Sequence, residues 1–270
     1  MNKNLGEILR IPPGSENQAD REDALRGFYE FYCERVQEGK AEFDDIMKIL
    51  EEVAEELVAS GEIGKNIRIL SRIKAPESLL NKMKLAIEKA KLEEEAGKNI
   101  SDNTKGTYDI CGVTILCENQ AELEKVLAEL KRKYVEIEEE TRRNSAGYQA
   151  THFRIPIRKF NNLKVECHLQ TIEQDKKNYP HLYYKVSQKN GNKKLTPEEE
   201  LEVNEEIQRQ YRRGELEGII LSNGKKSRVP QMWEARLDGN GKMVRKELTE
   251  YEALRLAYYP ALEGINEKDR

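Results

Sequence analysis

Two acidic residues with chemical potential lie in segments whose pattern is typical of β-strands. In TYDICGVTILC, strand alternation puts Asp109 on one face with small or branched apolar residues such as Val113 and Ile115. A lone buried carboxylate is costly unless it is paired, hydrogen-bonded or bound to a metal. In KVECHLQT, the same alternation puts Glu166 on a polar face with His168. Asp109 therefore needs a partner or a chemical role, whereas the polar face that carries Glu166 is, taken alone, typical of the solvated side of a sheet.

Asp109 and Glu166 could share one site if their strands are neighbours in a sheet. Two close carboxylates repel each other, which raises the pKa of one of them, unless a cation lies between them. Mg²⁺ typically takes one or two protein carboxylates and leaves its other positions to phosphate oxygens and water. Such an ion would also brace a phosphoryl group during transfer. The residues predict a magnesium-dependent, nucleotide-handling transferase with Asp109 and Glu166 as metal ligands.

The segment RIKAPESLLNKM has the features of a phosphate-binding helix start. Pro76 suits the first position of a helix, and Arg72 and Lys74 lie just before it. Ser78 and Lys82 are one helical turn apart, so lysine side chains and free backbone amides would converge on a polyphosphate. Lysine-rich helices are common, and an ordinary solvated helix is the alternative interpretation.

The segment NSAGYQATHF delivers Tyr148, and then His152, from a glycine-containing loop. An aromatic ring on such a loop can stack on a nucleobase, an interaction that contributes roughly 1–3 kcal/mol per base. An ordinary hairpin loop whose tyrosine covers the core explains this segment equally well when it is taken alone.

The periodicity of the whole chain predicts an α+β fold with a mixed β-sheet flanked by helices. The first hundred residues show helical spacing, and two of the expected helices end at Gly39 and Gly61. Strand-like segments begin at 107, and a DGNG sequence predicts a tight turn near the end of the chain. The expected helices cover 21–39, 41–61, 74–97, 119–134, 196–214 and 249–259, and the main expected strands cover 107–117, 134–140, 150–160 and 162–171.

The chain has 270 residues, of which 36% are charged, and a formal net charge of −4. Residues 1–140 carry 21 Lys and Arg against 31 Asp and Glu, whereas residues 141–270 carry 25 against 19. The basic second half could attract a polyanion such as a nucleotide or an RNA, although solvated surface explains any single basic cluster. No apolar run is long enough to span a membrane and no signal peptide is evident, so we expect a cytoplasmic protein. The four scattered cysteines predict neither disulfides nor a zinc site.

Five motifs in order resemble the synthetase domain of the RelA/SpoT alarmone synthetases. They are RIK with the following serine and lysine, DICG, GYQATH, VECHLQT and HLYYK, and together they extend from about residue 66 to 187. The resemblance implies a sheet of nucleotidyltransferase type. It also implies transfer of the β,γ-pyrophosphate of ATP to the ribose 3′-hydroxyl of GDP or GTP, which makes (p)ppGpp.

The resemblance assigns a role to each candidate residue. Asp109 and Glu166 would hold Mg²⁺, and Glu166 would also help to deprotonate the acceptor hydroxyl. Arg72 would lie against the adenine of ATP. The remaining ATP contacts would come from Lys74, Ser78 and Lys82, and the acceptor contacts from Tyr148, His152, His168, His181 and Lys185.

The sequence departs from the family pattern at several positions. Thr114 stands where the family usually has an arginine on the other side of the adenine. His168 replaces a glutamine and Gln170 replaces an arginine, while Arg143 and Asn144 are displaced counterparts of the loop residues before Gly-Tyr. These departures bear on donor and acceptor choice more than on the class of reaction.

Three functional hypotheses remain open. The first is a synthetase of guanosine alarmones. The second keeps the chemistry but changes the acceptor, as in toxic relatives that pyrophosphorylate the 3′ CCA end of tRNA or make adenosine alarmones. The third is a non-catalytic nucleotide- or RNA-binding relative. No HD dipeptide occurs, and the three histidines show no cluster along the sequence, so we expect a stand-alone synthetase without a hydrolase half.

The expected domain organisation has three parts. Residues 1–65 form an N-terminal helical region packed on the core, residues 66–213 form the synthetase core, and residues 214–270 form a C-terminal extension or small appended module. Small synthetases of this kind often form tetramers, so a homo-oligomer is also expected.

Overall fold

The computed structural model describes most of the chain. The described residues are 18–74, 110–134, 138–143, 149–156, 164–177, 182–183, 186, 194–214, 216 and 231–269. Among these residues, no helix is both long enough and apolar enough to cross a bilayer.

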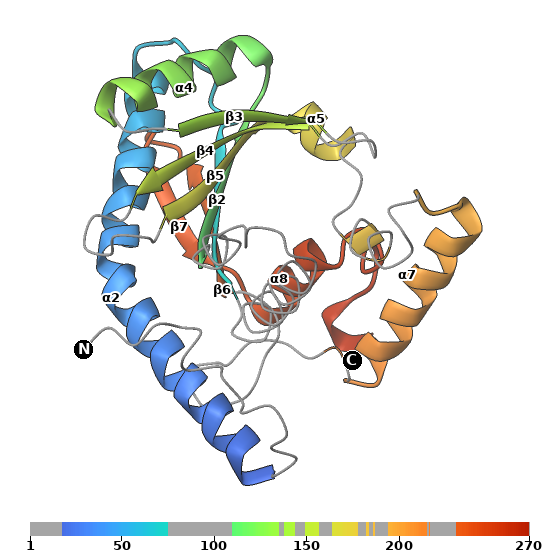
Figure 1. Ribbon diagram of the computed structural model, residues 1–270. Coiled ribbons are helices and arrows are strands. Elements are labelled where there is room, and N and C mark those ends of the chain that lie inside the picture. Colours follow the sequence, from blue (N-terminus) through green and yellow to red (C-terminus); the bar gives the residue numbers. More distant parts are fainter. Residues whose placement is uncertain are drawn as a thin grey trace, which may run out of the picture.

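A seven-stranded sheet forms the centre of the molecule, with the strand order β3-β4-β5-β2-β1-β6-β7 (Figure 1). All neighbouring strands are antiparallel except β2 and β5, which are parallel. The α+β class and the mixed sheet flanked by helices are therefore confirmed. The strands are β1 (Arg68–Ile73), β2 (Cys111–Cys117), β3 (Glu138–Arg143), β4 (Gln149–Pro156), β5 (Lys164–Thr171), β6 (Gln231–Leu237) and β7 (Met243–Glu247).

One face of the sheet forms the main hydrophobic core with helices α2 (Gln18–Ala59) and α4 (Gln120–Lys133). Strand alternation sends apolar side chains such as Val113, Val165 and Phe153 into this core, where each is at most 2% exposed. The opposite alternation leaves the polar positions of β4, β5 and β1 on the other face. This second face carries the candidate site and is called the open face below.

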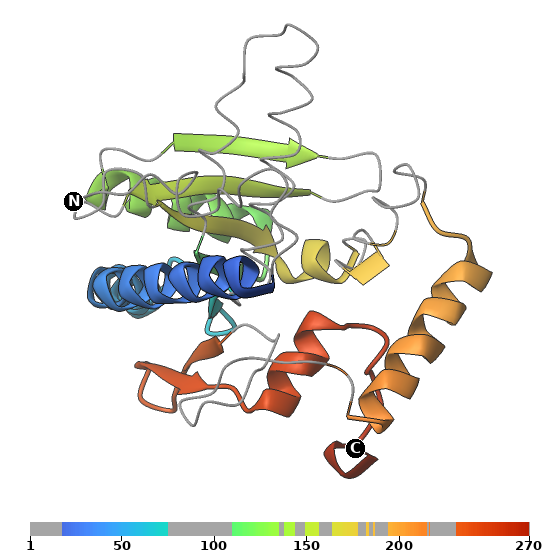
Figure 2. The ribbon, with the colours of Figure 1, turned by 60° about the horizontal axis from the view of Figure 1, so that its bottom comes forward.

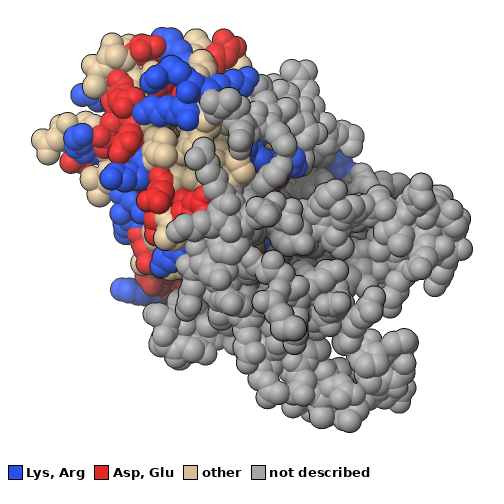
Figure 3. Space-filling view, turned by 60° about the vertical axis from the view of Figure 1, so that its left-hand side comes forward, with Lys and Arg blue, Asp and Glu red and all other residues tan. Residues whose placement is uncertain are grey.

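Ion pairs link α2 to β7 and to α4. Asp44 pairs with Arg245 and Glu55 with Lys242, both of them on or next to β7, and Glu56 pairs with Lys133 of α4. Figure 3 shows acidic and basic side chains interspersed over the described part of one face of the molecule. Exposed pairs of this kind contribute little stability individually, about 0–1 kcal/mol each. They favour the docking of an acidic helix on basic neighbours.

Local sequence signals place three helices as expected. Asn119 caps α4, and its side chain accepts a hydrogen bond from the backbone N–H of Glu122. Thr196 forms a capping box with Glu199 at the start of α7 (Pro197–Arg212), and Thr249 does the same for α8 (Glu250–Ala257). The expected pairing of 150–160 with 162–171 is also confirmed by β4 and β5, which are antiparallel neighbours.

The N-terminal prediction of two helices is wrong, because α2 runs without a break for 42 residues. Gly39 lies inside this helix and is buried. Packed positions recur at three- and four-residue spacing on both sides of it, from Val36 through Phe43 and Met47, so packing offsets the cost of about 1 kcal/mol for a helical glycine. Gly61, by contrast, follows the end of the helix as expected, with a φ of 74°.

The prediction that only helices precede the strand at 107–117 is also wrong. Strand β1 comes earlier and pairs along its whole length with β2 on one side and β6 on the other. Its sequence, RILSRI, is short, and its buried positions include Ser71 while its half-buried positions include Leu70, so its alternation is weak without the neighbouring strands. The expected helix at 74–97 lies outside the described residues, apart from Lys74.

The C-terminal extension joins the central sheet. Strands β6 and β7 form the expected hairpin around the DGNG turn, where Gly241 has a φ of 78°. Helices α7 and α8 pack together through a second cluster that includes Tyr211, Ala253 and Leu254, and Figure 2 shows the two helices side by side. The division of the chain at 65/66 and 213/214 stays a prediction. The sheet is continuous across 213/214, because β1 pairs with β6, and α2 shares the main core with the strands that follow 65/66.

Candidate functional site

The open face gathers polar side chains from the middle of the sheet. On β5, Glu166 lies opposite Gly112 of β2 and Arg154 of β4. Two residues further along, His168 lies opposite Thr114 of β2 and His152 of β4. The register therefore brings residues that are far apart in the sequence into one cluster.

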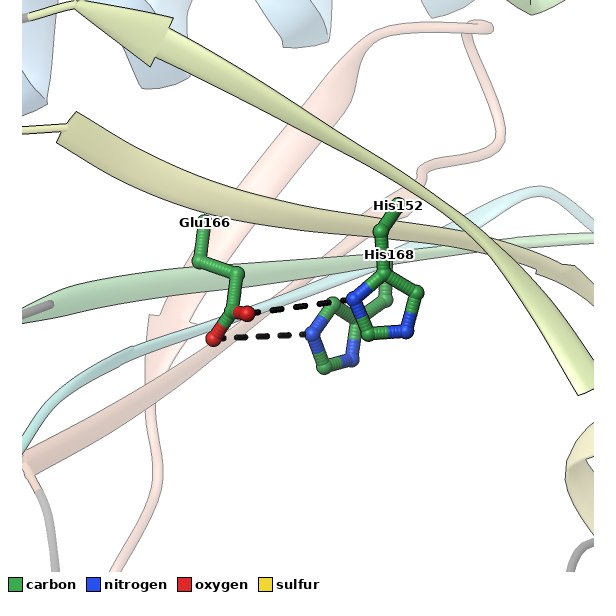
Figure 4. A group of neighbouring side chains, drawn as sticks. All are labelled: His152, Glu166 and His168. Atoms are coloured by element: carbon green, nitrogen blue, oxygen red, sulfur yellow. Dashed lines mark ion pairs between the residues drawn. The ribbon is translucent and has the colours of Figure 1, made fainter. Parts of the chain in front are cut away.

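His152, Glu166 and His168 form the centre of this cluster, as Figure 4 shows. Nδ1 of His152 lies 3.8 Å from Oε1 of Glu166, and Nε2 of His168 lies 3.7 Å from Oε2. The two imidazole rings have centroids 4.0 Å apart and are tilted by 36°. The side chain of His152 is 8% exposed, that of Glu166 20% and that of His168 24%. The cluster is half-buried and keeps one side open to solvent.

The charges of the cluster follow from these contacts. The imidazoles of His152 and His168 hold the pKa of the Glu166 carboxyl well below its ordinary value, although burial acts in the opposite direction. Burial lowers the pKa of His168; the Glu166 carboxylate opposes this shift, while the charges of His152 and Arg72 add to it. Near neutral pH the cluster thus presents an ionised carboxylate beside a neutral His168 imidazole.

Arg72 reaches this cluster because Gly112 lies beneath it. A Cβ added at Gly112 would lie 3.2 Å from Nε and 3.5 Å from Cγ of Arg72, and 3.8 Å from the carbonyl oxygen of Glu166. The absence of a side chain at Gly112 therefore lets the arginine cross β2 toward β5. The glycine of the DICG motif has a clear steric function.

Other expected residues take defined positions near the cluster. The backbone N–H of Lys74 donates to the carbonyl of Ile110, 2.8 Å away, which extends the pairing of β1 and β2 by one residue. Strand alternation places Lys74 on the same face as Arg72. Gln170, which replaces a family arginine, is buried and donates a 2.7 Å hydrogen bond to Asp175 in α5 (Ile172–Lys177).

Two features of the site were not evident from the sequence. The three histidines show no cluster along the chain, whereas cross-strand pairing brings His152 and His168 together beside Glu166. Arg154, which was not a candidate, lies on the open face opposite Glu166. The period of two within KVECHLQT gave the shared face of Glu166 and His168, but only the register gives their proximity to His152.

Six of the expected site residues are not tested by this geometry. They lie outside the described residues, and they are Ser78, Lys82, Asp109, Tyr148, His181 and Lys185. The described strand β2 begins at Cys111, so the pairing of Asp109 with Glu166 stays a prediction.

Much of the sequence that forms this face of the sheet matches a known protein family. Residues 71–190 match the family model described as a region found in RelA / SpoT proteins. Strands β2, β4 and β5 lie wholly within this range, and Arg72 lies in the half of β1 that it includes. No significant match to a curated protein is found.

Solved structures give more distant likenesses. Small alarmone synthetase 1 from Bacillus subtilis bound to its product pppGpp is 12% identical, with a TM-score of 0.43 over 64% of this chain and 88% of that one. A GTP pyrophosphokinase family protein from Streptococcus pneumoniae is 14% identical, with a TM-score of 0.43 over 68% and 91%. The Bacillus subtilis enzyme bound to AMPCPP is 13% identical, with a TM-score of 0.37 over 66% and 90%.

Proposed function

We propose that the chain is an ATP-dependent pyrophosphokinase, because residues 71–190 match the family model described as a region found in RelA / SpoT proteins. It transfers the β,γ-pyrophosphate of ATP to the ribose 3′-hydroxyl of GDP or GTP, with AMP as the leaving group, and so makes (p)ppGpp. The observation that carries this proposal is the register of Arg72 and Glu166 on either side of Gly112 on the open face. In the proposed reaction the carboxylate would act on the acceptor hydroxyl, and the guanidinium would bind the nucleotide donor.

Glu166 has the properties that activation of a hydroxyl requires. Its carboxyl is ionised at neutral pH, it is half-buried, and rigid strands fix its position. Pyrophosphoryl transfer depends on positioning and on neutralisation of charge more than on covalent catalysis. A carboxylate held beside the acceptor 3′-hydroxyl would orient that hydroxyl and accept its proton as the new bond forms.

The family implies Mg²⁺, and Glu166 fits one part of its requirements. Its carboxylate supplies the kind of oxygen donor that Mg²⁺ prefers, and Asp109 would supply a second one. The neighbouring donors among the described residues are imidazole nitrogens, which are less suited to this ion. When bound to Asp109 and Glu166, Mg²⁺ would neutralise negative charge on the phosphate oxygens.

The proposed contacts divide between the two nucleotides, the donor ATP and the acceptor GDP or GTP. Arg72 lies against the adenine, and Lys74, Ser78 and Lys82 contact the phosphates of ATP. The acceptor is bound by Tyr148, which stacks on the guanine. Further acceptor contacts come from His152, His168, His181 and Lys185.

The excess of basic residues in the second half of the chain supports a second acceptor, the 3′ end of tRNA. Lys176, Lys194 and Arg212, three basic residues of this half of the chain, are exposed. An adenosine acceptor, as in the toxic relatives that make adenosine alarmones, is a related alternative. A non-catalytic binding role is the remaining alternative.

The test offers purified protein γ-labelled ATP and Mg²⁺ with one acceptor at a time: GDP, GTP, ADP, ATP or deacylated tRNA. We expect label in ppGpp with GDP and in pppGpp with GTP. Label on tRNA or on an adenine nucleotide would replace the guanosine acceptor by that alternative. Transfer to none of the five acceptors would contradict the enzyme and leave a binding protein.

A further inference from the structure

We propose that His152, Glu166 and His168 bind a first-row transition-metal dication of the Mn²⁺, Co²⁺ or Zn²⁺ type. The inference deepens the proposed function, because it concerns the ion that the proposed active site selects. It goes beyond a magnesium site made of two carboxylates, since both additional donors are imidazole nitrogens.

The geometry already approaches that of a metal site. One donor atom from each residue lies within 4.8 Å of the other two. The two nitrogen–oxygen distances that face Glu166 are 3.8 and 3.7 Å. With metal–ligand bonds of about 2.0–2.2 Å, neighbouring donors around one ion lie roughly 3.0–3.4 Å apart. Small rotations of the side chains would therefore bring the three donors to bonding distance.

The backbone already places these three donors together, so metal binding requires rotation of side chains only. His152 and His168 are direct cross-strand partners on β4 and β5, and Glu166 is two residues before His168 on the same face. A parallel neighbour, β2, supports β5 from the other side. Ligands on paired strands in the middle of a sheet are better fixed than ligands on loops.

The donor set selects the kind of ion. Imidazole nitrogens suit zinc, copper, iron and nickel, whereas Mg²⁺ prefers oxygen donors in a near-ideal octahedron. Two histidines and one carboxylate on one side of an ion leave its remaining positions open, and the partial exposure of Glu166 and His168 allows water or a phosphate oxygen to reach them. Three protein ligands and an open position are also typical of catalytic zinc sites.

His168 is the residue that makes the site unusual within the resemblance described above. A glutamine at this position, as in the usual family pattern, would offer a weakly coordinating amide in place of an imidazole. The chain holds only three histidines, and the register places two of them at the same carboxylate. An ion bound there would occupy Glu166 and compete with Mg²⁺ for it.

The binding test uses nucleotide-free protein from which any histidine tag has been removed. Co²⁺ is added while its visible d–d absorption is recorded, and binding of Mn²⁺ and Zn²⁺ is followed by calorimetry. We expect one ion per chain, binding at least tenfold tighter than Mg²⁺, and a cobalt spectrum of low coordination number. His168→Gln and Glu166→Gln should each weaken binding at least tenfold.

A matched control is Glu247→Gln, the same substitution as Glu166→Gln at an exposed acid on β7, which should bind Co²⁺ as the wild type does. Circular dichroism and thermal melting verify that each variant is folded. No Co²⁺ binding below millimolar concentration, or unchanged binding by His168→Gln, would overturn the proposal. An equal loss in Glu247→Gln would overturn the assignment to these three residues.

Failure of this inference is distinguishable from failure of the proposed function, because no nucleotide is present in the titration. Magnesium-dependent transfer by the wild-type protein is measured separately. Transfer without Co²⁺ binding rejects the transition-metal site alone. Tight Co²⁺ binding without transfer to any acceptor rejects the enzyme but keeps the metal site.

Discussion

A substitution at Gly112 should impair the use of ATP without unfolding the protein. A Cβ at this position would meet Nε of Arg72 at 3.2 Å, closer than comfortable van der Waals contact. Alanine therefore forces the arginine aside by a few tenths of an ångström, and the branched side chain of valine forces it further. The perturbation acts on Arg72 through packing alone, since the charge of the site does not change.

The magnitudes follow from the contact that is lost. If Arg72 stacks on the adenine, its removal in Arg72→Gln costs about 1–3 kcal/mol, which corresponds to a rise of roughly 5- to 150-fold in the KM for ATP. A small shift off its preferred rotamer costs about 0.5–1 kcal/mol, so Gly112→Ala should raise the KM roughly two- to fivefold. Gly112→Val should approach the effect of Arg72→Gln. Stability should not fall in Gly112→Ala, because alanine is favoured over glycine within a strand by roughly 0.5–1 kcal/mol.

The assay measures initial rates of transfer against ATP concentration, together with thermal melting of each variant. Gly239→Ala is the matched control, because nothing lies within 4 Å of a Cβ added in the β6–β7 turn. Its KM for ATP should equal that of the wild type. The reasoning is refuted if Gly112→Val leaves the KM unchanged while Arg72→Gln raises it, since Arg72 would then not depend on the space above Gly112.

Three further predictions concern stability and use denaturant or thermal unfolding. Phe153→Ala should lower the free energy of unfolding by about 3–5 kcal/mol, because the ring is fully buried between the sheet and its helices; a loss under 1 kcal/mol would contradict this packing. Thr196→Ala should cost about 1 kcal/mol by removing the capping box of α7, and an unchanged midpoint would show that the box is dispensable. Burial raises the pKa of Glu51 despite the charge of Arg245, so the native state favours its protonated form and loses stability as pH rises through the native pKa. Glu51→Gln should therefore raise the melting temperature at pH 7 and have a smaller effect near pH 4; an equal or larger gain at pH 4 would contradict the shift.

Much of the fold could be predicted from the sequence, because its signals are local. Asn119, Thr196 and Thr249 cap helices where the sequence analysis expected them. The change from helical to strand periodicity located β2, β4 and β5. These features depend on neighbouring residues, so one chain carries enough information to find them.

The features that sequence analysis missed depend on distant contacts. Gly39 normally favours the end of a helix, but the core under α2 carries the helix through it. Strand β1 gains its definition from β2 and β6, and the latter lies more than 150 residues away in the chain. In the site, alternation gave the shared face of Glu166 and His168, whereas their proximity to His152 came from the register of β4 with β5.

The central claim is that Glu166 activates the acceptor hydroxyl in pyrophosphoryl transfer. The most direct measurement compares the wild type, Glu166→Gln and Glu247→Gln for transfer from γ-labelled ATP to GDP and GTP, with the product identified by mass and by its 3′-linkage. Glu247 is an exposed acid on β7 and serves as the matched control. We predict that Glu247→Gln keeps the wild-type rate and that Glu166→Gln, while folded, loses at least about 100-fold. A Glu166→Gln protein that still makes (p)ppGpp at near wild-type rate would contradict the account.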